Sequence, residues 1–203
     1  IGFEAGVGGG AAMADCVAIG SGAMNSTAAN AQSGIVAIGS SALTALTSGI
    51  ENLAIGYTAL AGLTTGAANT VIGHNAANAM SVGETSNVVI GTDAMGAVDE
   101  GTAGGDADHN VAIGKDALYG GDFAGNDRQL QGNIAIGSGA MDSTSTNAQT
   151  GTIAIGRSAL TALTSGANNV AIGYQSMIET TQGNYNTAIG YRCLDAQDAG
   201  ADA

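Results

Sequence analysis

Side chains able to carry out chemistry are few in this 203-residue chain. It has two histidines, His74 and His109, two cysteines, Cys16 and Cys193, and four basic residues against 17 acidic ones. The sequence contains no nucleophile elbow, no HExxH zinc motif and no Walker phosphate loop. Paired carboxylates of a glycosidase would need a cleft, and no pattern in the sequence indicates one. We therefore expect that the chain is not an enzyme.

Aromatic and cationic side chains recur at a regular interval and offer a different kind of chemistry. Tyr57 and His74 are 17 residues apart, and the same step separates Arg157, Tyr174 and Tyr191. Aromatic rings beside polar groups suit sugars, because a ring covers the apolar face of a pyranose while its neighbours bond the hydroxyls. An ordinary column of surface side chains explains the same spacing. The ligand-binding candidates are Tyr57, His74, Arg157, Tyr174, Tyr191 and Arg192.

Carboxylates are concentrated near two segments, 96–109 and 119–132, which interrupt the regular spacing. Carboxylates with backbone carbonyls in Gly-rich turns are the ligands that Ca²⁺ prefers, so a site at Asp106, Asp108 or Asp122 is one interpretation. A solvated acidic bulge is the other, since neither segment matches an EF-hand or a Gly-Gly-x-Gly-x-Asp repeat. Beyond this calcium candidate we expect no cofactor.

The overall charge narrows the range of partners. A formal charge of −13 and a pI near 4.1 make nucleic acid an unsuitable ligand, because the phosphate backbone attracts basic surfaces. No run of about 18 apolar residues occurs, so we expect no membrane insertion. Cys16 and Cys193 lie at opposite ends of the repeats, too far apart for a disulfide within one chain.

The dipeptide Ile-Gly organises the whole sequence, which we interpret as one repetitive domain over 1–203. Most successive copies are 17 to 19 residues apart, and two gaps are 23 residues. A longer repeat relates 19–73 to 136–190, a shift of 117 residues. After a first copy at Ile1, the dipeptides are Ile19-Gly20, Ile38-Gly39, Ile55-Gly56, Ile72-Gly73, Ile90-Gly91, Ile113-Gly114, Ile136-Gly137, Ile155-Gly156, Ile172-Gly173 and Ile189-Gly190.

Each isoleucine ends a short segment such as Val36-Ala37-Ile38, in which every second residue is β-branched. This period of two predicts a strand with two apolar faces. We expect the isoleucine to point into a coil and the alanine side to be covered by another copy of the chain. An apolar pair four and five residues after the isoleucine, such as Ala59-Leu60, predicts a second strand. The glycine implies positive φ or a close backbone approach, and an asparagine three residues before most of the isoleucines can take αL or form a ladder.

Two units, AIGYTALAGLTTGAANTVIG at 54–73 and AIGYQSMIETTQGNYNTAIG at 171–190, resemble the head repeats of trimeric autotransporter adhesins. They look closer still to the AIG-Y-x-A-L repeats of viral tail fibres. The resemblance implies a left-handed parallel β-roll, three chains packed around one axis, and a place on a virion or a bacterial surface. It also implies attachment to a cell-surface glycan or receptor.

We therefore expect an all-β parallel β-solenoid of about ten to eleven rungs, packed as a homotrimer. The function predicted is a structural and adhesive segment of an extracellular fibre, with the viral version slightly favoured. One alternative is a purely structural filament subunit that stacks end to end. The other is an ice- or Ca-binding solenoid, although Thr44, Thr47, Thr64 and Thr65 do not recur on every repeat.

Overall fold

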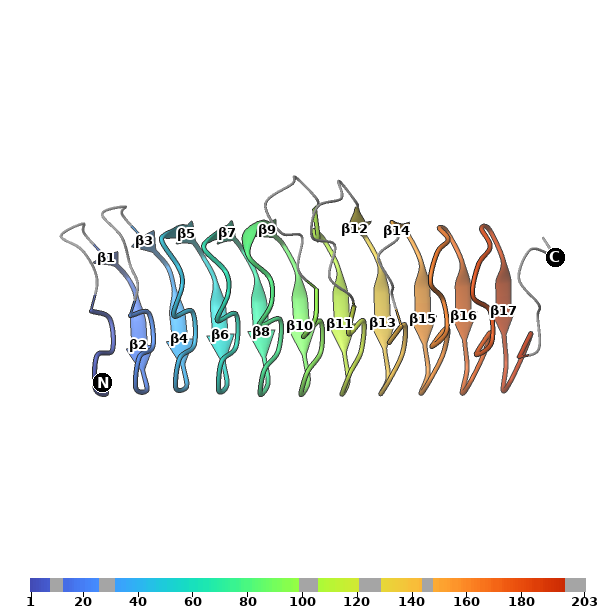
Figure 1. Ribbon diagram of the computed structural model, residues 1–203, viewed down its shortest axis with the longest axis horizontal. Helices are drawn as coiled ribbons and strands as arrows, with labels where there is room; N and C mark the ends of the chain where they lie inside the picture. Colours follow the sequence, from blue (N-terminus) through green and yellow to red (C-terminus); the bar gives the residue numbers. More distant parts are fainter. Residues whose placement is uncertain (8–12, 26–31, 99–105, 121–128, 144–147, 196–203) are drawn as a thin grey trace.

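The computed structural model describes residues 1–7, 13–25, 32–98, 106–120, 129–143 and 148–195. These residues form a rod-shaped, all-β parallel solenoid in which the chain winds around one long axis (Figure 1). Its main sheet contains ten parallel strands side by side. They are β2 (Val17–Ile19), β4 (Val36–Ile38), β6 (Leu53–Ile55), β8 (Thr70–Ile72), β10 (Val88–Ile90), β11 (Val111–Ile113), β13 (Ile134–Ile136), β15 (Ile153–Ile155), β16 (Val170–Ile172) and β17 (Thr187–Ile189).

Two smaller parallel sheets lie on another side of the coil. Five strands form the first: β1 (Met13–Ala14), β3 (Gln32–Ser33), β5 (Ser48–Ile50), β7 (Thr65–Ala67) and β9 (Val82–Thr85). The second contains β12 (Leu130–Gln131) and β14 (Gln149–Thr150). No helix among the described residues is long and apolar enough to cross a membrane.

The register of the main sheet places equivalent residues on top of one another. Ile38 pairs with Ile55, and Ala37 pairs with Ala54. The same matching holds across the two 23-residue gaps, where Ile113 pairs with both Ile90 and Ile136. The register of the main sheet is therefore the same across the two longer gaps as across the shorter ones. At about 4.8 Å per strand, ten strands span roughly 43 Å along the axis.

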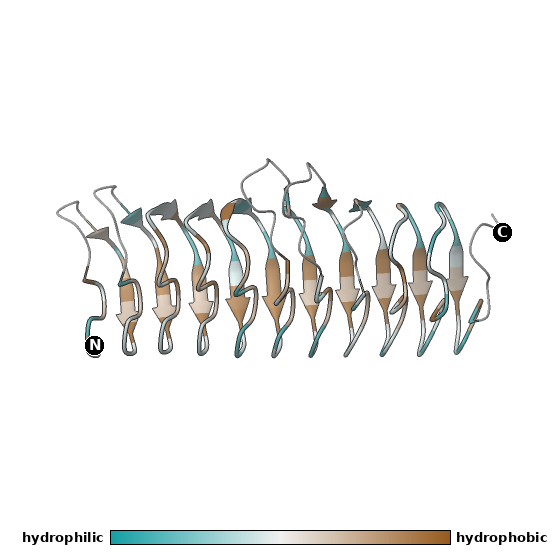
Figure 2. Cartoon of the chain, in the orientation of Figure 1, coloured by the Kyte–Doolittle hydropathy of each residue, from teal (hydrophilic) through white to brown (hydrophobic). Residues whose placement is uncertain are grey.

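The expected orientation of the main strands is wrong. The middle residue, such as Ala37 or Ala54, is fully buried inside the coil, whereas the flanking Val36, Ile38 and Ile55 are partly exposed on the outside. The alanine side is therefore inside each single coil and needs no sister chain to cover it. The isoleucine side faces outward instead. Figure 2 shows that the strands of the main sheet consist mostly of hydrophobic residues.

The volume of the core explains this orientation. Leu43 and Leu46, five and eight residues after Ile38, are fully buried, and Leu60 and Leu63 repeat them on the next turn. These large side chains fill a narrow interior across from the main sheet. Only a small residue fits beside them at native packing density, so alanine points in and isoleucine must point out.

The expected second strand is also wrong. In the segment after each isoleucine, Ser41 and Leu43 both have φ between 50° and 60°, and Thr58 and Leu60 repeat these values. A strand requires negative φ, so this segment is a series of turns. Its NH groups still bond the next turn of the coil, as from Leu43 N to Ala59 O at 3.1 Å. The second sheet is formed by the following segment, which is rich in Thr, Ser and Gly.

The glycine after each isoleucine has positive φ, and all of these glycines except Gly190 also lie close to the backbone of the next turn. Gly56 has a φ of +139°, and a Cβ added there would lie 2.1 Å from the carbonyl oxygen of Gly73. Side chains are excluded by conformation and by space together, which accounts for the repetition of this residue.

The two halves of the 117-residue duplication repeat their hydrogen bonds. The side-chain amide of Gln32 donates to Leu46 O, as that of Gln149 does to Leu163 O. Thr44 donates its hydroxyl to Gly22 O, and Thr161 donates to Gly139 O. Equivalent residues therefore occupy equivalent environments in both blocks.

Candidate functional site

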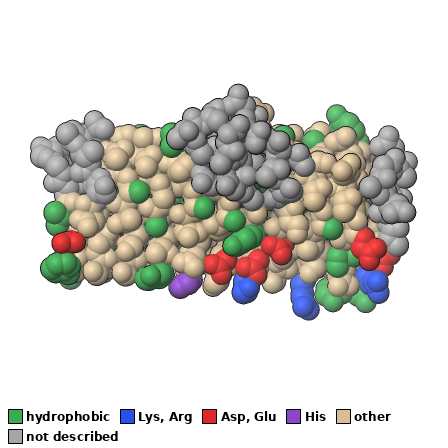
Figure 3. All heavy atoms as spheres, in the orientation of Figure 1, with side chains coloured by type: hydrophobic (Ala, Val, Ile, Leu, Met, Phe, Trp, Pro, Cys, Tyr) green, Lys and Arg blue, Asp and Glu red, His purple; other side chains and the backbone are tan. Residues whose placement is uncertain are grey.

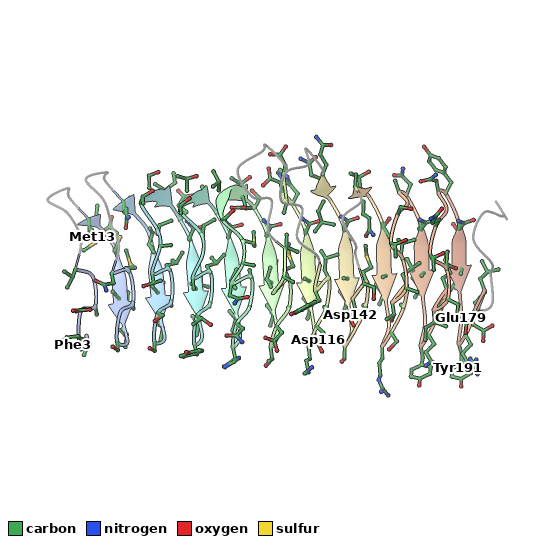
Figure 4. All side chains as sticks on the ribbon, in the orientation of Figure 1. Phe3, Met13, Asp116, Asp142, Glu179 and Tyr191 are labelled. Carbon is green, nitrogen blue, oxygen red and sulfur yellow. The ribbon has the colours of Figure 1, made fainter. Side chains whose placement is uncertain are left out.

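The glycine that follows each repeated isoleucine turns a corner of the coil, and the residue directly after this corner glycine lies on one edge of the rod. We call these side chains the corner column, and every one of them is exposed. Its members are Phe3, Ser21, Ser40, Tyr57, His74, Thr92, Lys115, Ser138, Arg157, Tyr174 and Tyr191. The carbonyl of each of the first ten accepts a hydrogen bond from the next turn, as Tyr57 O does from Asn75 N at 2.9 Å. Figure 4 shows Phe3 and Tyr191 projecting from the same edge at opposite ends.

The structure brings most of the ligand-binding candidates into two stacks within this column. The rings of Tyr57 and His74 are 5.2 Å apart between centroids, with 19° between their planes. Tyr174 and Tyr191 stack at 5.5 Å and 8°. The guanidinium of Arg157 lies 5.9 Å from the centre of the Tyr174 ring, so it covers one face of that ring.

Arg192 lies beside the column rather than in it. Its Nε is 2.8 Å from a carboxylate oxygen of Asp195, and both side chains are partly exposed. An exposed ion pair of this kind contributes at most about 1 kcal/mol. The two stacks are separate sites, because Thr92, Lys115 and Ser138 occupy the turns between His74 and Arg157.

Charged side chains gather along the same edge of the rod (Figure 3). Lys115 pairs with the Asp116 carboxylate, and this hydrogen bond raises the pKa of the lysine. Burial, followed by repulsion from Asp116, raises the pKa of Asp142. In this cluster of Lys115, Asp116 and Asp142, the lysine offsets part of the negative charge, and none of the three side chains is fully buried.

The calcium candidates do not form a cluster in the described part of the chain. Asp108 uses one carboxylate oxygen to accept the Thr85 NH at 2.6 Å, and Asp106 contacts the Gln131 amide at 3.4 Å. Asp122 lies outside the described residues. Within these residues, no three His, Cys, Asp or Glu side chains come together as a metal site.

Threonines that could have formed an ice-binding face use their hydroxyls internally. Thr47 donates to Thr64 O at 2.8 Å, Thr64 to Ser81 O at 2.6 Å, and Thr164 to Thr181 O at 2.9 Å. These donors stabilise the contact between successive turns.

A second surface runs along the outer face of the main sheet. We call it the Val/Ile stripe, and it contains the first and third residues of the ten strands. All of these side chains are apolar except Thr70 and Thr187, and none is buried. Inner members such as Ile55 are only partly exposed because identical neighbours about 4.8 Å away cover their flanks. Ile189, at the last strand, is 65% exposed.

No protein-family model, curated protein or solved structure matches this chain. Its function is therefore inferred from the two surfaces.

Three residues, Ser21, Ser40 and Glu84, are not among the site candidates predicted from the sequence. Ser21 and Ser40 share the corner column with the aromatic residues, and their place after the corner glycine is the signal that finds them. Glu84, six residues before Ile90, is buried inside the coil. Gln32 and Gln149 occupy the same position relative to Ile38 and Ile155, so alignment of the repeats identifies a polar interior position.

Proposed function

We propose that this chain is a non-enzymatic structural and adhesive segment of a homotrimeric extracellular fibre. The Val/Ile stripe is the observation that carries the proposal. It runs along all ten strands of the main sheet, and its side chains lie outside the coil rather than in the core.

A continuous apolar stripe of this length is costly to leave in water. Soluble monomers seldom expose contiguous apolar patches larger than a few hundred Å², and larger patches mark interfaces. Each coil already has a closed core of its own, which includes Ala54, Leu60 and Leu63. The stripe is therefore additional apolar surface, and sister chains in the same register would cover it along its whole length.

The number three and the left-handed winding come from the resemblance to the adhesin-head and tail-fibre repeats. Three stripes around one axis would each contact two others, forming a second apolar core between the coils. Each Ile-Gly dipeptide would mark one rung of every coil. The three coils side by side would then form a fibre segment about as long as the main sheet. The corner column would remain at the edge of each coil, where it can meet a cell-surface glycan or receptor.

The interface can be tested by introducing one glutamate at a residue of the stripe and, separately, one at an apolar residue that does not belong to it. Ile55→Glu puts three carboxylates near the axis, and desolvation of each ion costs several kcal/mol. We expect this variant to give folded single chains. Ile50→Glu is the matched control, because Ile50 is 46% exposed on β5, outside the stripe. The measurements are circular dichroism for the fold and light scattering for the mass.

The expected result is a loss of trimer for Ile55→Glu alone, with β signal retained in both variants. Equal masses for both variants would contradict packing through the stripe. Growth of the unmodified chain into particles of increasing length would favour the end-to-end filament instead.

A further inference from the structure

The ring faces of the corner column are not equally available to a ligand. Tyr174 has Tyr191 on one face and the Arg157 guanidinium on the other, so it offers only its edge and hydroxyl. His74 covers one face of Tyr57. The other face of Tyr57 points along the column toward Ser40, whose side chain is too short to cover a phenol ring. Tyr57 is 54% exposed.

Two serines continue the column from this open face. Backbone hydrogen bonds hold these successive turns together. Ser40 O accepts from the NH of Thr58, the residue after Tyr57, at 3.0 Å, and Ser21 O accepts from the NH of Ser41, the residue after Ser40, at 2.8 Å. Both side chains are exposed, and within the described residues neither hydroxyl makes a hydrogen bond. Phe3, which is 75% exposed, follows on the next turn. Three turns separate Tyr57 from Phe3, so the two serines lie in a gap of roughly 14 Å between two aromatic rings.

The chemistry of this step favours an uncharged ligand with one apolar face. The cationic members of the column, Lys115 and Arg157, lie at least three turns beyond Tyr57. The chain as a whole carries a formal charge of −13, which repels anions. A pyranose ring has CH groups on one face, which pack against the negative face of an aromatic ring, and hydroxyls around its rim.

We propose that the open face of Tyr57, with the hydroxyls of Ser40 and Ser21, binds a neutral hexopyranose. This inference rests on the proposed adhesive function and specifies its ligand. The sugar ring lies on Tyr57 above Ser40, and its rim hydroxyls exchange hydrogen bonds with the two serines. One stacked ring and a few exposed hydrogen bonds give millimolar affinity. Three copies in one fibre raise the avidity for a surface that carries many sugars.

The test uses methyl glycosides of glucose, galactose, mannose and N-acetylglucosamine with the full chain. Saturation-transfer NMR reports which sugar protons contact the protein, and titration gives the dissociation constant. Tyr57→Ala removes the platform. Ser40→Tyr covers the open face of Tyr57 with a second ring. This variant should fold, because Tyr174 and Tyr191 already stack in the same way on successive turns. Tyr174→Ala is the control within the same column.

We expect at least one sugar to bind, with affinity reduced about tenfold or more by Tyr57→Ala and by Ser40→Tyr. Tyr174→Ala should leave the affinity within about twofold. The inference is overturned if none of the four sugars binds or if binding survives both changes at Tyr57 and Ser40. Sugar binding is read independently of mass, so a chain that binds but stays single would reject the trimer and keep the site.

Discussion

At the scale of single residues, Glu84 is a carboxyl group enclosed in an apolar coil. Its side chain is only 1% exposed. One oxygen, Oε1, accepts the NH groups of Ser81 and Val82, both at 3.0 Å, while Oε2 is buried with no hydrogen-bond partner. Burial raises the pKa of Glu84 above its usual 4.5, and the nearby Asp108 adds to this rise.

The sign of the pH effect follows from this shift. The folded chain holds the Glu84 proton more tightly than the unfolded chain, so protonation stabilises the fold. This stabilisation is fully present below the unfolded pKa of about 4.5 and is lost as pH rises through the higher folded pKa. Replacing the Glu84 carboxylate with a neutral group should therefore raise the free energy of unfolding most near neutral pH.

We predict that Glu84→Gln raises the free energy of unfolding near neutral pH by about 1–2 kcal/mol, the scale set by a buried unpaired polar atom. Glutamine is already present at the equivalent positions 32 and 149, so the interior accepts its shape. Urea unfolding at neutral and at acidic pH measures the effect, and the gain should shrink in acid. Glu179→Gln is the control, because Glu179 is exposed. A gain of the same size at both pH values would contradict the assignment.

At the scale of elements, buried asparagines connect successive turns of the coil. Asn87 donates its amide to Asn69 Oδ1 at 3.1 Å and to Ala107 O at 2.7 Å. Its own oxygen accepts the backbone NH of Asn110 at 2.9 Å. The pattern runs from Asn52 to Asn133 without a break, and every amide after Asn52 has partners on both neighbouring turns.

We predict that Asn87→Ala lowers the free energy of unfolding by about 2–4 kcal/mol, because it removes the donor to the buried Ala107 carbonyl and the acceptor of the buried Asn110 NH. Chemical denaturation followed by circular dichroism gives this value. Asn184→Ala provides the comparison, since Asn184 is exposed and accepts one NH, from Ala167 at 2.8 Å. Equal losses of unfolding free energy in the two variants would show that the buried asparagine ladder stabilises the fold no more than one exposed hydrogen bond does.

The sequence predicts these elements unevenly. Repetition of Ile-Gly indicates stacked turns, and the asparagines indicate a ladder, because both residue types have narrow structural uses. Alternation in Val36-Ala37-Ile38 shows that the two faces of a strand differ without showing which one is inside. That choice depends on the volume of Leu43 and Leu46, which the repeat places opposite. The residue types of Ser41 and Leu43 give no sign of their positive φ, so the sequence predicts a strand where the structure has turns.

At the scale of the whole molecule, the orientation of the main strands changes what the chain offers to partners. With alanine inside, each coil can close its own core, and the larger Val and Ile side chains remain for contact between chains. The corner column lies at the edge of the same sheet, because its residues follow the corner glycine directly. Stacking of Tyr57 on His74 follows from their spacing of 17 residues, whereas the open face of Tyr57 becomes apparent only once the occupied faces are known.

The mass of the unmodified chain in solution tests the central claim most directly. Sedimentation equilibrium should give the mass of three chains of 19.5 kDa each, unchanged by dilution through the micromolar range. A stable, folded single chain would contradict the account, because the Val/Ile stripe would then face water along the whole rod.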